Sequence, residues 1–241
     1  MEDKILFHGS RGGIDGEIAP ISRVRCDFGK GFYMGEDSYQ AKSLVAEDTS
    51  PYFYTLKFHL SEIPEDRILN LTNNEDWLFT ILANRKKVPE FNELYIAQEY
   101  LKMCEKYDVI IGAIADDQMS EAMQRFSNRG LTDKGLIACL KAIKYGNQYV
   151  AKTEFACSKI EILDCKELYG REINDIKEYS YQKKKNVYGI VDEMSEKYQL
   201  DGMYLNQIIK NASEYCKKNI NEPCKGSSNL NNIKANRDYE R

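Results

Sequence analysis

The most informative stretch of this sequence is DFGKGFYMG, residues 27–35. It contains two glycines one residue apart, Gly29 and Gly31, followed by the aromatic pair Phe32 and Tyr33. Glycine adopts the positive φ values that tight turns require. Taken alone, the stretch therefore indicates a turn that leads into a strand.

Two further short pieces give this stretch a more specific meaning. The first is FHGS (residues 7–10), at the end of a short predicted strand, and the second is NQYVAKT (residues 147–153), at the start of a late one. Alone, the first fits a core histidine with a turn, and Gln148 in the second fits a strand cap. Together the pieces offer a polar side chain, exposed glycine backbone and an aromatic platform. That combination suits a planar ring that carries an amide.

The pattern of apolar residues around these pieces predicts a mixture of strands and helices. Residues 52–60 alternate as a half-buried strand does. No regular strand–helix alternation and no Gly-x-Gly-x-x-Gly turn occurs, which argues against a Rossmann fold and favours an α+β fold. Strands are predicted over residues 4–8, 52–60, 67–71, 107–115, 149–153 and 160–163, and helices over residues 37–47, 74–86, 93–106, 118–126 and 132–145.

The composition excludes several classes of chemistry. The chain has 241 residues, a net charge of −4 and two histidines, His8 and His59. Its seven cysteines include no C-x-x-C pair, so we expect no zinc or iron–sulfur site and no metal. An odd number of irregularly spaced cysteines is typical of reduced thiols, hence of the cytoplasm. No signal-peptide pattern and no apolar run near 18 residues occurs, so we expect no membrane association.

The three pieces, in this order, resemble the ADP-ribosyltransferase superfamily, on the branch shared by diphtheria toxin and the poly(ADP-ribose) polymerases. That branch carries a His-Gly-Ser/Thr strand, a Gly-Lys-Gly-aromatic-Tyr strand before a helix of small residues, and a strand opened by Asn-Glu-Tyr-x-Val. The sequence resembles even more closely a bacterial family of uncharacterised function within that superfamily. The resemblance covers residues 5–165 and includes the motifs HGS, DFGKGFY and NQY. The fold implied has split mixed or antiparallel β-sheets, flanking helices and, here, a helical C-terminal segment.

The resemblance implies that NAD is the substrate and assigns a role to each matching residue. His8 would bind the adenosine ribose, and Gly9 would bind the nicotinamide carboxamide through its backbone. Tyr33 would stack on the nicotinamide, and Gln148 occupies the position of the catalytic Glu. The implied reaction is cleavage of the nicotinamide–ribose bond through an oxocarbenium-like state. The implied NAD-binding set is His8, Gly9, Ser10, Lys30, Gly31, Phe32, Tyr33, Ala41 and Ser43.

Gln148 departs from the superfamily pattern. A neutral amide hydrogen-bonds a ribose hydroxyl but lacks the charge with which a carboxylate stabilises the developing cation. Glu154 lies about 20 Å further along an extended strand and replaces the missing Glu only if the strand ends by Thr153 and folds back. The departure points to mono- rather than poly-ADP-ribosylation, or to an NAD binder without catalysis.

Other charged residues have two interpretations each. Arg25, like Arg11 and Arg23, either meets the pyrophosphate of NAD or is solvated surface. The pair Asp116–Asp117 either does acid–base chemistry or contacts the acceptor, or else caps the following helix. His59 is predicted to lie on the surface.

The domain organisation follows from a change of composition near residue 180. We expect an ADP-ribosyltransferase-like NAD-binding domain over residues 1–179, a helical module over 180–223 and a disordered tail over 224–241. The module weakly resembles the small helical partner encoded beside the bacterial family in toxin–antitoxin-like arrangements. It therefore either restrains the domain as a fused partner or completes its core as a helical hairpin.

The expected function is mono-ADP-ribosylation of a bacterial or phage, toxin-like type. ADP-ribose would move from NAD to a protein or nucleic-acid acceptor, with NAD glycohydrolysis as a side activity. The alternative is a catalytically weak or inactive NAD-binding module whose helical C-terminus binds a partner. A third possibility, an interaction protein that uses the fold as a scaffold, is left open because fold resemblance alone does not establish function.

Overall fold

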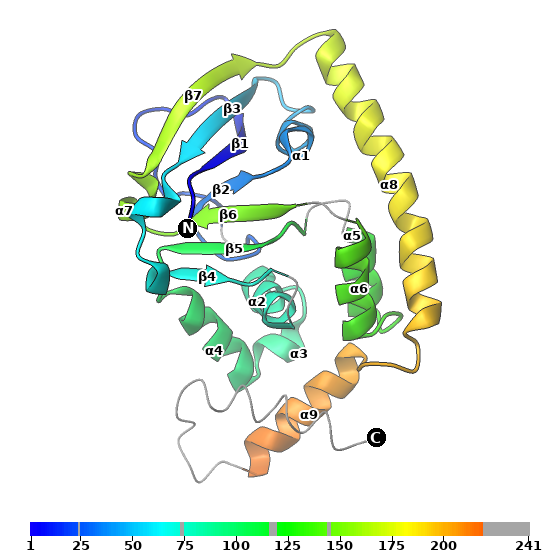
Figure 1. The fold of residues 1–241 in the computed structure, drawn as a ribbon. Coiled ribbons are helices and arrows are strands. Elements are labelled where there is room, and N and C mark those ends of the chain that lie inside the picture. Colours follow the sequence, from blue (N-terminus) through cyan, green and yellow to red (C-terminus); the bar gives the residue numbers. More distant parts are fainter. Residues whose placement is uncertain (24, 73–74, 116–119, 144–145, 219–241) are drawn as a thin grey trace.

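A computed structural model describes residues 1–23, 25–72, 75–115, 120–143 and 146–218. The predicted α+β class is confirmed, since these residues form a mixed seven-stranded sheet with flanking helices (Figure 1). The strand order is β4-β5-β6-β2-β1-β3-β7, with β4 and β5 parallel and the other neighbours antiparallel. The strands are β1 (Lys4–Arg11), β2 (Phe32–Gly35), β3 (Pro51–Phe58), β4 (Ile68–Asn70), β5 (Val109–Ala113), β6 (Asn147–Ala151) and β7 (Ile160–Glu167).

The helices gather mostly at one end and along one side of the sheet (Figure 1). Two 3₁₀ turns, Leu60–Glu62 and Glu65–Arg67, follow β3. The α-helices of the described chain are α1 (Ser38–Ser43), α2 (Glu75–Arg85), α3 (Pro89–Asn92), α4 (Tyr95–Cys104), α5 (Ser120–Ser127), α6 (Asp133–Ile143), α7 (Glu154–Cys157), α8 (Arg171–Lys197) and α9 (Leu205–Lys218).

The two faces of the sheet pack against different cores. Side chains alternate along a strand, so Tyr33 and its neighbour Phe32 point to opposite faces. Tyr33 packs on the larger core, which includes residues of α2, α4, α5, α6, α8 and α9. Phe32 belongs to a second core that contains Leu6 and Leu56 from the neighbouring strands. We call these the Tyr33 face and the Phe32 face.

Helix α8 joins the C-terminal part of the chain to the sheet. It is continuous from Arg171 to Lys197 and runs along one side of the molecule, past α1, α5 and α6 (yellow in Figure 1). The predicted domain boundary at residue 180 falls inside it. Val187 and Val191 of α8 and Leu205 of α9 are buried in the larger core. These helices therefore complete that core. No described helix is both long and apolar enough to cross a membrane.

Several element ends differ from the predictions. The helix predicted over residues 37–47 ends at Ser43, and the one predicted over 93–106 begins at Tyr95 because Leu94 is extended. The strand predicted to start at residue 149 starts at Asn147, so it includes Gln148. The next strand along the chain, β7, extends to Glu167, four residues beyond the predicted end. The predicted disordered tail, residues 224–241, lies outside the described residues.

Candidate functional site

The three sequence pieces lie on adjacent strands. FHGS is in β1, Phe32 to Gly35 form β2, and NQY opens β6, in the order β6-β2-β1. Gly35 pairs with Phe7 on one side and with Gln148 on the other. Segments more than 100 residues apart in the sequence thus meet at the centre of the sheet.

Tyr33 and Gln148 share one face of the sheet. Gly35 and Gln148 are cross-strand partners, and Tyr33 is two residues from Gly35 on the same strand. This makes Tyr33 and Gln148 diagonal neighbours, which lie about 7–8 Å apart in sheets, within reach of long side chains. The pair predicted to hold the nicotinamide ring and the ribose is therefore side by side.

His8 occupies the other face. Its ring centroid is 4.4 Å from that of Phe32, and its Nδ1 lies 2.7 Å from the Tyr33 carbonyl oxygen. A carbonyl only accepts, so Nδ1 carries the proton and donates. Burial lowers the pKa of the imidazole, and the hydrogen bond to Tyr33 opposes part of this change. His8 therefore touches the backbone of Tyr33 but does not share its face.

The strands β1 and β2 separate beside His8. Within the described residues of these two strands, the backbone pairing is Phe7 with Gly35 alone. In contrast, β3 pairs with β1 along its full length, from Lys4 to Arg11. The His8 ring therefore bridges a gap where the ladder of β1 and β2 has ended.

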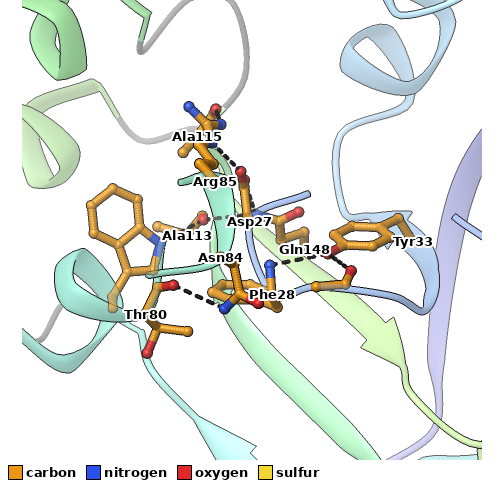
Figure 2. A network of polar contacts seen from close by, with 11 residues as sticks. Asp27, Phe28, Tyr33, Thr80, Asn84, Arg85, Ala113, Ala115 and Gln148 are labelled. Carbon is orange, nitrogen blue, oxygen red and sulfur yellow. Dashed lines mark hydrogen bonds and ion pairs between the residues drawn. The ribbon is translucent and has the colours of Figure 1, made fainter. Parts of the chain in front are cut away.

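A polar network surrounds Gln148 on the Tyr33 face (Figure 2). Gln148 is 8% exposed, and its Nε2 donates to Asp27 Oδ2 at 2.8 Å and to the Ala113 carbonyl at 3.2 Å. The other Asp27 oxygen, Oδ1, accepts from Arg85 Nε at 2.6 Å. Arg85 also donates to the Ala115 carbonyl. Asp27 thus lies between the arginine and the amide.

The segment Cys26–Gly31, which we call the 26–31 loop, covers this site. Tyr33 donates through its hydroxyl to the Gly29 carbonyl at 2.7 Å and accepts from the Phe28 N–H at 3.0 Å. Burial, and then the negative charge of Asp27, raises the pKa of the Tyr33 phenol. Lys152 donates to the Phe28 carbonyl. The loop thus binds the hydroxyl of Tyr33 as well as the amide of Gln148.

Close packing explains the glycines of this region. Phe28 is fully buried, and a Cβ on Gly112 of β5 would lie 2.6 Å from its ring. Gly29 has φ +77° and lies against Asn84, where a Cβ would be 2.8 Å from the amide oxygen. A Cβ on Gly31 would be 2.4 Å from Val150. Only glycine fits at these three positions.

Helix α1 covers β1 beside this site. A Cβ on Gly9 would lie 2.2 Å from the Ala41 carbonyl oxygen, so α1 crosses β1 in direct contact. Ala41 is buried, and the Ser43 hydroxyl donates to the Gln40 carbonyl. The Ser10 hydroxyl donates to the Gly13 carbonyl. Gly9 and Ala41 are therefore brought together in a packing contact, and Ser43 lies two residues further along α1.

The remaining candidates lie apart from the network. Arg25 is exposed with φ +77°, and Lys30 is exposed on the 26–31 loop. His59 contacts Asp3 at 3.0 Å and Glu161 at 3.4 Å, away from β2 and β6. Asp116 and Asp117 lie outside the described residues. The strand β6 begins with Asn147 and Gln148 and ends at Ala151. Glu154 is exposed in α7, which follows the far end of β6 from Gln148.

Sequence reasoning missed Asp27, Arg85 and Lys152 as members of the site. Asp27 was visible as the first residue of the DFGKGFYMG stretch. Its partners lie 58 and 121 residues further along the chain, and no local pattern pairs them. Among the described residues, no group of His, Cys, Asp and Glu side chains is arranged to hold a metal ion.

Comparison with known proteins identifies a family. No curated protein and no solved structure matches this chain. A family model described as "Protein of unknown function (DUF3990)" matches residues 4–162, from the first residue of β1 into β7. The match contains all three pieces of the site and leaves out α8 and α9. The chain therefore belongs to the DUF3990 family.

Proposed function

We propose that this protein is an NAD-dependent mono-ADP-ribosyltransferase. The observation that carries the proposal is that β1, β2 and β6 are neighbours, with Tyr33 and Gln148 side by side on one face. An aromatic ring and a hydrogen-bonding side chain at this separation suit the nicotinamide and the ribose of NAD. The acceptor is a macromolecule, and an additional partner would bind the exposed side of α8, which carries Tyr181 and Tyr188.

The gap between β1 and β2 supports this function. Beyond Phe7, the backbone of β1 pairs with β3 on one side only. On the other side, toward β2, the His8 ring contacts the Tyr33 carbonyl. A carboxamide carries one donor and one acceptor group, which complement a free N–H and C=O on a strand edge. Gly9 is the residue of β1 expected to hold the nicotinamide there.

The described structure is a closed form of this site. The 26–31 loop uses the Tyr33 hydroxyl and the Gln148 amide that NAD would contact. NAD binding therefore requires Phe28 and Gly29 of this loop to move away from the Tyr33 hydroxyl, so that Phe28 leaves its buried position. Because only the open fraction of the protein binds NAD, the apparent affinity falls in proportion to that fraction.

Free thiols support a reducing compartment such as the cytoplasm, where NAD is available. Within the described residues, Cys26, Cys104, Cys139, Cys157 and Cys165 are free thiols. Burial raises the pKa of the thiols of Cys139 and Cys157, to about 12 and about 11. Thiols of this kind are unreactive structural residues.

The test is the release of nicotinamide from labelled NAD. Tyr33→Ala and His8→Ala should each lower turnover at least tenfold, because each removes a group expected to hold NAD. Matched controls are His59→Ala, which removes the other histidine, and Tyr169→Ala, which removes a 76% exposed tyrosine. Equal turnover in the wild type and all four variants would refute the proposal, provided that their melting temperatures show folded protein.

A second candidate is a non-catalytic NAD-binding module. It is favoured by one observation, that the Gln148 amide is hydrogen-bonded within the chain rather than free in an open cleft. This candidate predicts NAD binding by calorimetry without nicotinamide release. Under this hypothesis, a rise in glycohydrolase activity in Gln148→Glu would mean that the site lacks a single charged group.

A further inference from the structure

We propose that Asp27 supplies the carboxylate that position 148 lacks. This inference rests on the proposed function and assigns a catalytic residue to it. Asp27 Oδ2 lies 2.8 Å from Gln148 Nε2. A negative group is thus one hydrogen bond away from the side chain at which the superfamily pattern places its Glu.

The Gln148 amide is oriented so that it works together with Asp27. Both partners of Nε2, the Asp27 carboxylate and the Ala113 carbonyl, are hydrogen-bond acceptors. Two acceptors at this end of the side chain identify it as the amide nitrogen, and the two hydrogen bonds use both Nε2 hydrogens. The Oε1 of Gln148 remains as the acceptor for a ribose hydroxyl, while Asp27 provides the charge.

The geometry of the Asp27 ion pair differs from that of a purely structural pair in the same molecule. Asp108 is also buried beside an arginine, but Arg67 bonds both of its oxygens, at 2.9 and 3.0 Å. Such bidentate pairing is the stronger arrangement. Arg85 takes one oxygen of Asp27, and the second oxygen faces Gln148.

The position of Asp27 in the chain also favours this role. It is at the start of the 26–31 loop, whose Phe28 and Gly29 contact the Tyr33 hydroxyl. A shift of Phe28 and Gly29 opens the face of Tyr33 to a ring, while Arg85 and Gln148 hold Asp27 in place. The carboxylate would then line the same opening as Tyr33.

The reaction step is balanced with water as the acceptor. The bond between nicotinamide N1 and ribose C1′ breaks, and its electron pair leaves with nicotinamide, which becomes neutral. Positive charge develops on C1′ and the ring oxygen, where the Asp27 carboxylate stabilises it. Water attacks C1′, and Asp27 accepts the released proton and returns it to solvent. The products are nicotinamide, ADP-ribose and one proton.

The experiment compares Asp27→Asn with Asp108→Asn, which neutralises the other arginine-paired, buried aspartate. Nicotinamide release and NAD affinity by calorimetry are measured separately. We expect Asp27→Asn to lower the rate of nicotinamide release about 100-fold, the size typical of removing one charge-stabilising group, with NAD affinity changed less than fivefold. Asp108→Asn should keep the wild-type rate.

A charge exchange makes the test independent of folding defects in the single variant. The double variant Asp27→Asn, Gln148→Glu moves the carboxylate across the 2.8 Å hydrogen bond and keeps the net charge. The double variant should cleave NAD at least tenfold faster than Asp27→Asn does. If Asp27→Asn does not fold, the rate of the double variant should be within tenfold of the wild-type rate. A double variant that is folded and inactive would overturn the proposal.

The outcomes separate this proposal from the proposed function. Wild-type cleavage with an undiminished rate in Asp27→Asn overturns the role of Asp27 and leaves the transferase intact. Wild-type NAD binding without cleavage also overturns the catalytic role and supports the non-catalytic module. Neither binding nor cleavage by the wild type refutes the proposed function itself.

Discussion

The two faces of the central sheet are built from the same strands but differ in chemistry. The Tyr33 face buries a hydrogen-bonded set of polar groups, Asp27, Arg85 and Gln148, next to fully buried Phe28. The Phe32 face is an apolar core in which the His8 ring makes one backbone hydrogen bond. Buried polar groups are costly unless they are fully paired. The difference fits the proposal that most of the reacting side chains lie on the Tyr33 face, with His8 as the proposed NAD-binding side chain on the Phe32 face.

The largest effect should come from removing one buried aromatic ring on each face. Phe28 and Phe58 are both fully buried, so replacing either by Ala should lower the free energy of unfolding by about 3–4 kcal/mol. Phe28 alone belongs to the 26–31 loop. Urea unfolding should therefore show similar losses, while NAD turnover changes in Phe28→Ala only. Turnover that falls equally in folded Phe58→Ala would show that the faces are not functionally separate.

The next effect comes from the ion pair that supports the Tyr33 face. Arg85→Met leaves the Asp27 carboxylate without its cation in a site that is 11% exposed, and should cost about 2 kcal/mol of unfolding free energy. Arg67→Met leaves Asp108, whose side chain is 9% exposed, without its bidentate partner, so its loss of unfolding free energy should be at least as large. Chemical denaturation measures both losses, and nicotinamide release should fall in Arg85→Met only. An equal fall in folded Arg67→Met would contradict the functional separation of the two ion pairs.

A pH dependence distinguishes the Phe32 face. Burial holds the pKa of His8 below its ordinary value of 6.5. The unfolded chain therefore binds a proton at a higher pH than the folded protein does, and the free energy of unfolding falls as the pH decreases below about 6.5 toward the folded-state pKa. His8→Gln should reduce this fall in urea titrations between pH 5 and 7.5. His59→Gln, the control, should retain the His8 contribution.

The smallest effect is expected at the contact between α1 and α8. Lys183 Nζ lies 3.1 Å from Asp37, which caps α1, and the Tyr39 and Tyr179 rings are 4.4 Å apart. Lys183→Met should cost about 0.5 kcal/mol, as for other partly exposed ion pairs. Amide exchange in α1, above Gly9, should become faster. Unchanged exchange would show that α8 does not help to hold α1 on the sheet.

Local patterns in the sequence predicted the α+β class and the approximate positions of most elements. These predictions succeeded where a single segment contains the whole pattern, as in the alternation of residues 52–60 or the apolar run that forms β5. They failed where a partner lies far along the chain. The Gln148–Asp27 bond joins residues 121 positions apart, and no local pattern pairs them. The proposed activity and the roles of the site residues remain predictions.

The strand β7 has a consequence for the solubility of shortened chains. The family match ends at Ile162, inside this strand, which forms an edge of the sheet and pairs with β3. Its exposed residues include Glu161, Asp164, Lys166 and Glu167, charges that oppose edge-to-edge aggregation. A chain cut at residue 162 would leave much of β3, with buried Phe53 and Tyr54, as an unpaired edge. It should self-associate, whereas a chain that keeps β7 and α8 should remain monodisperse.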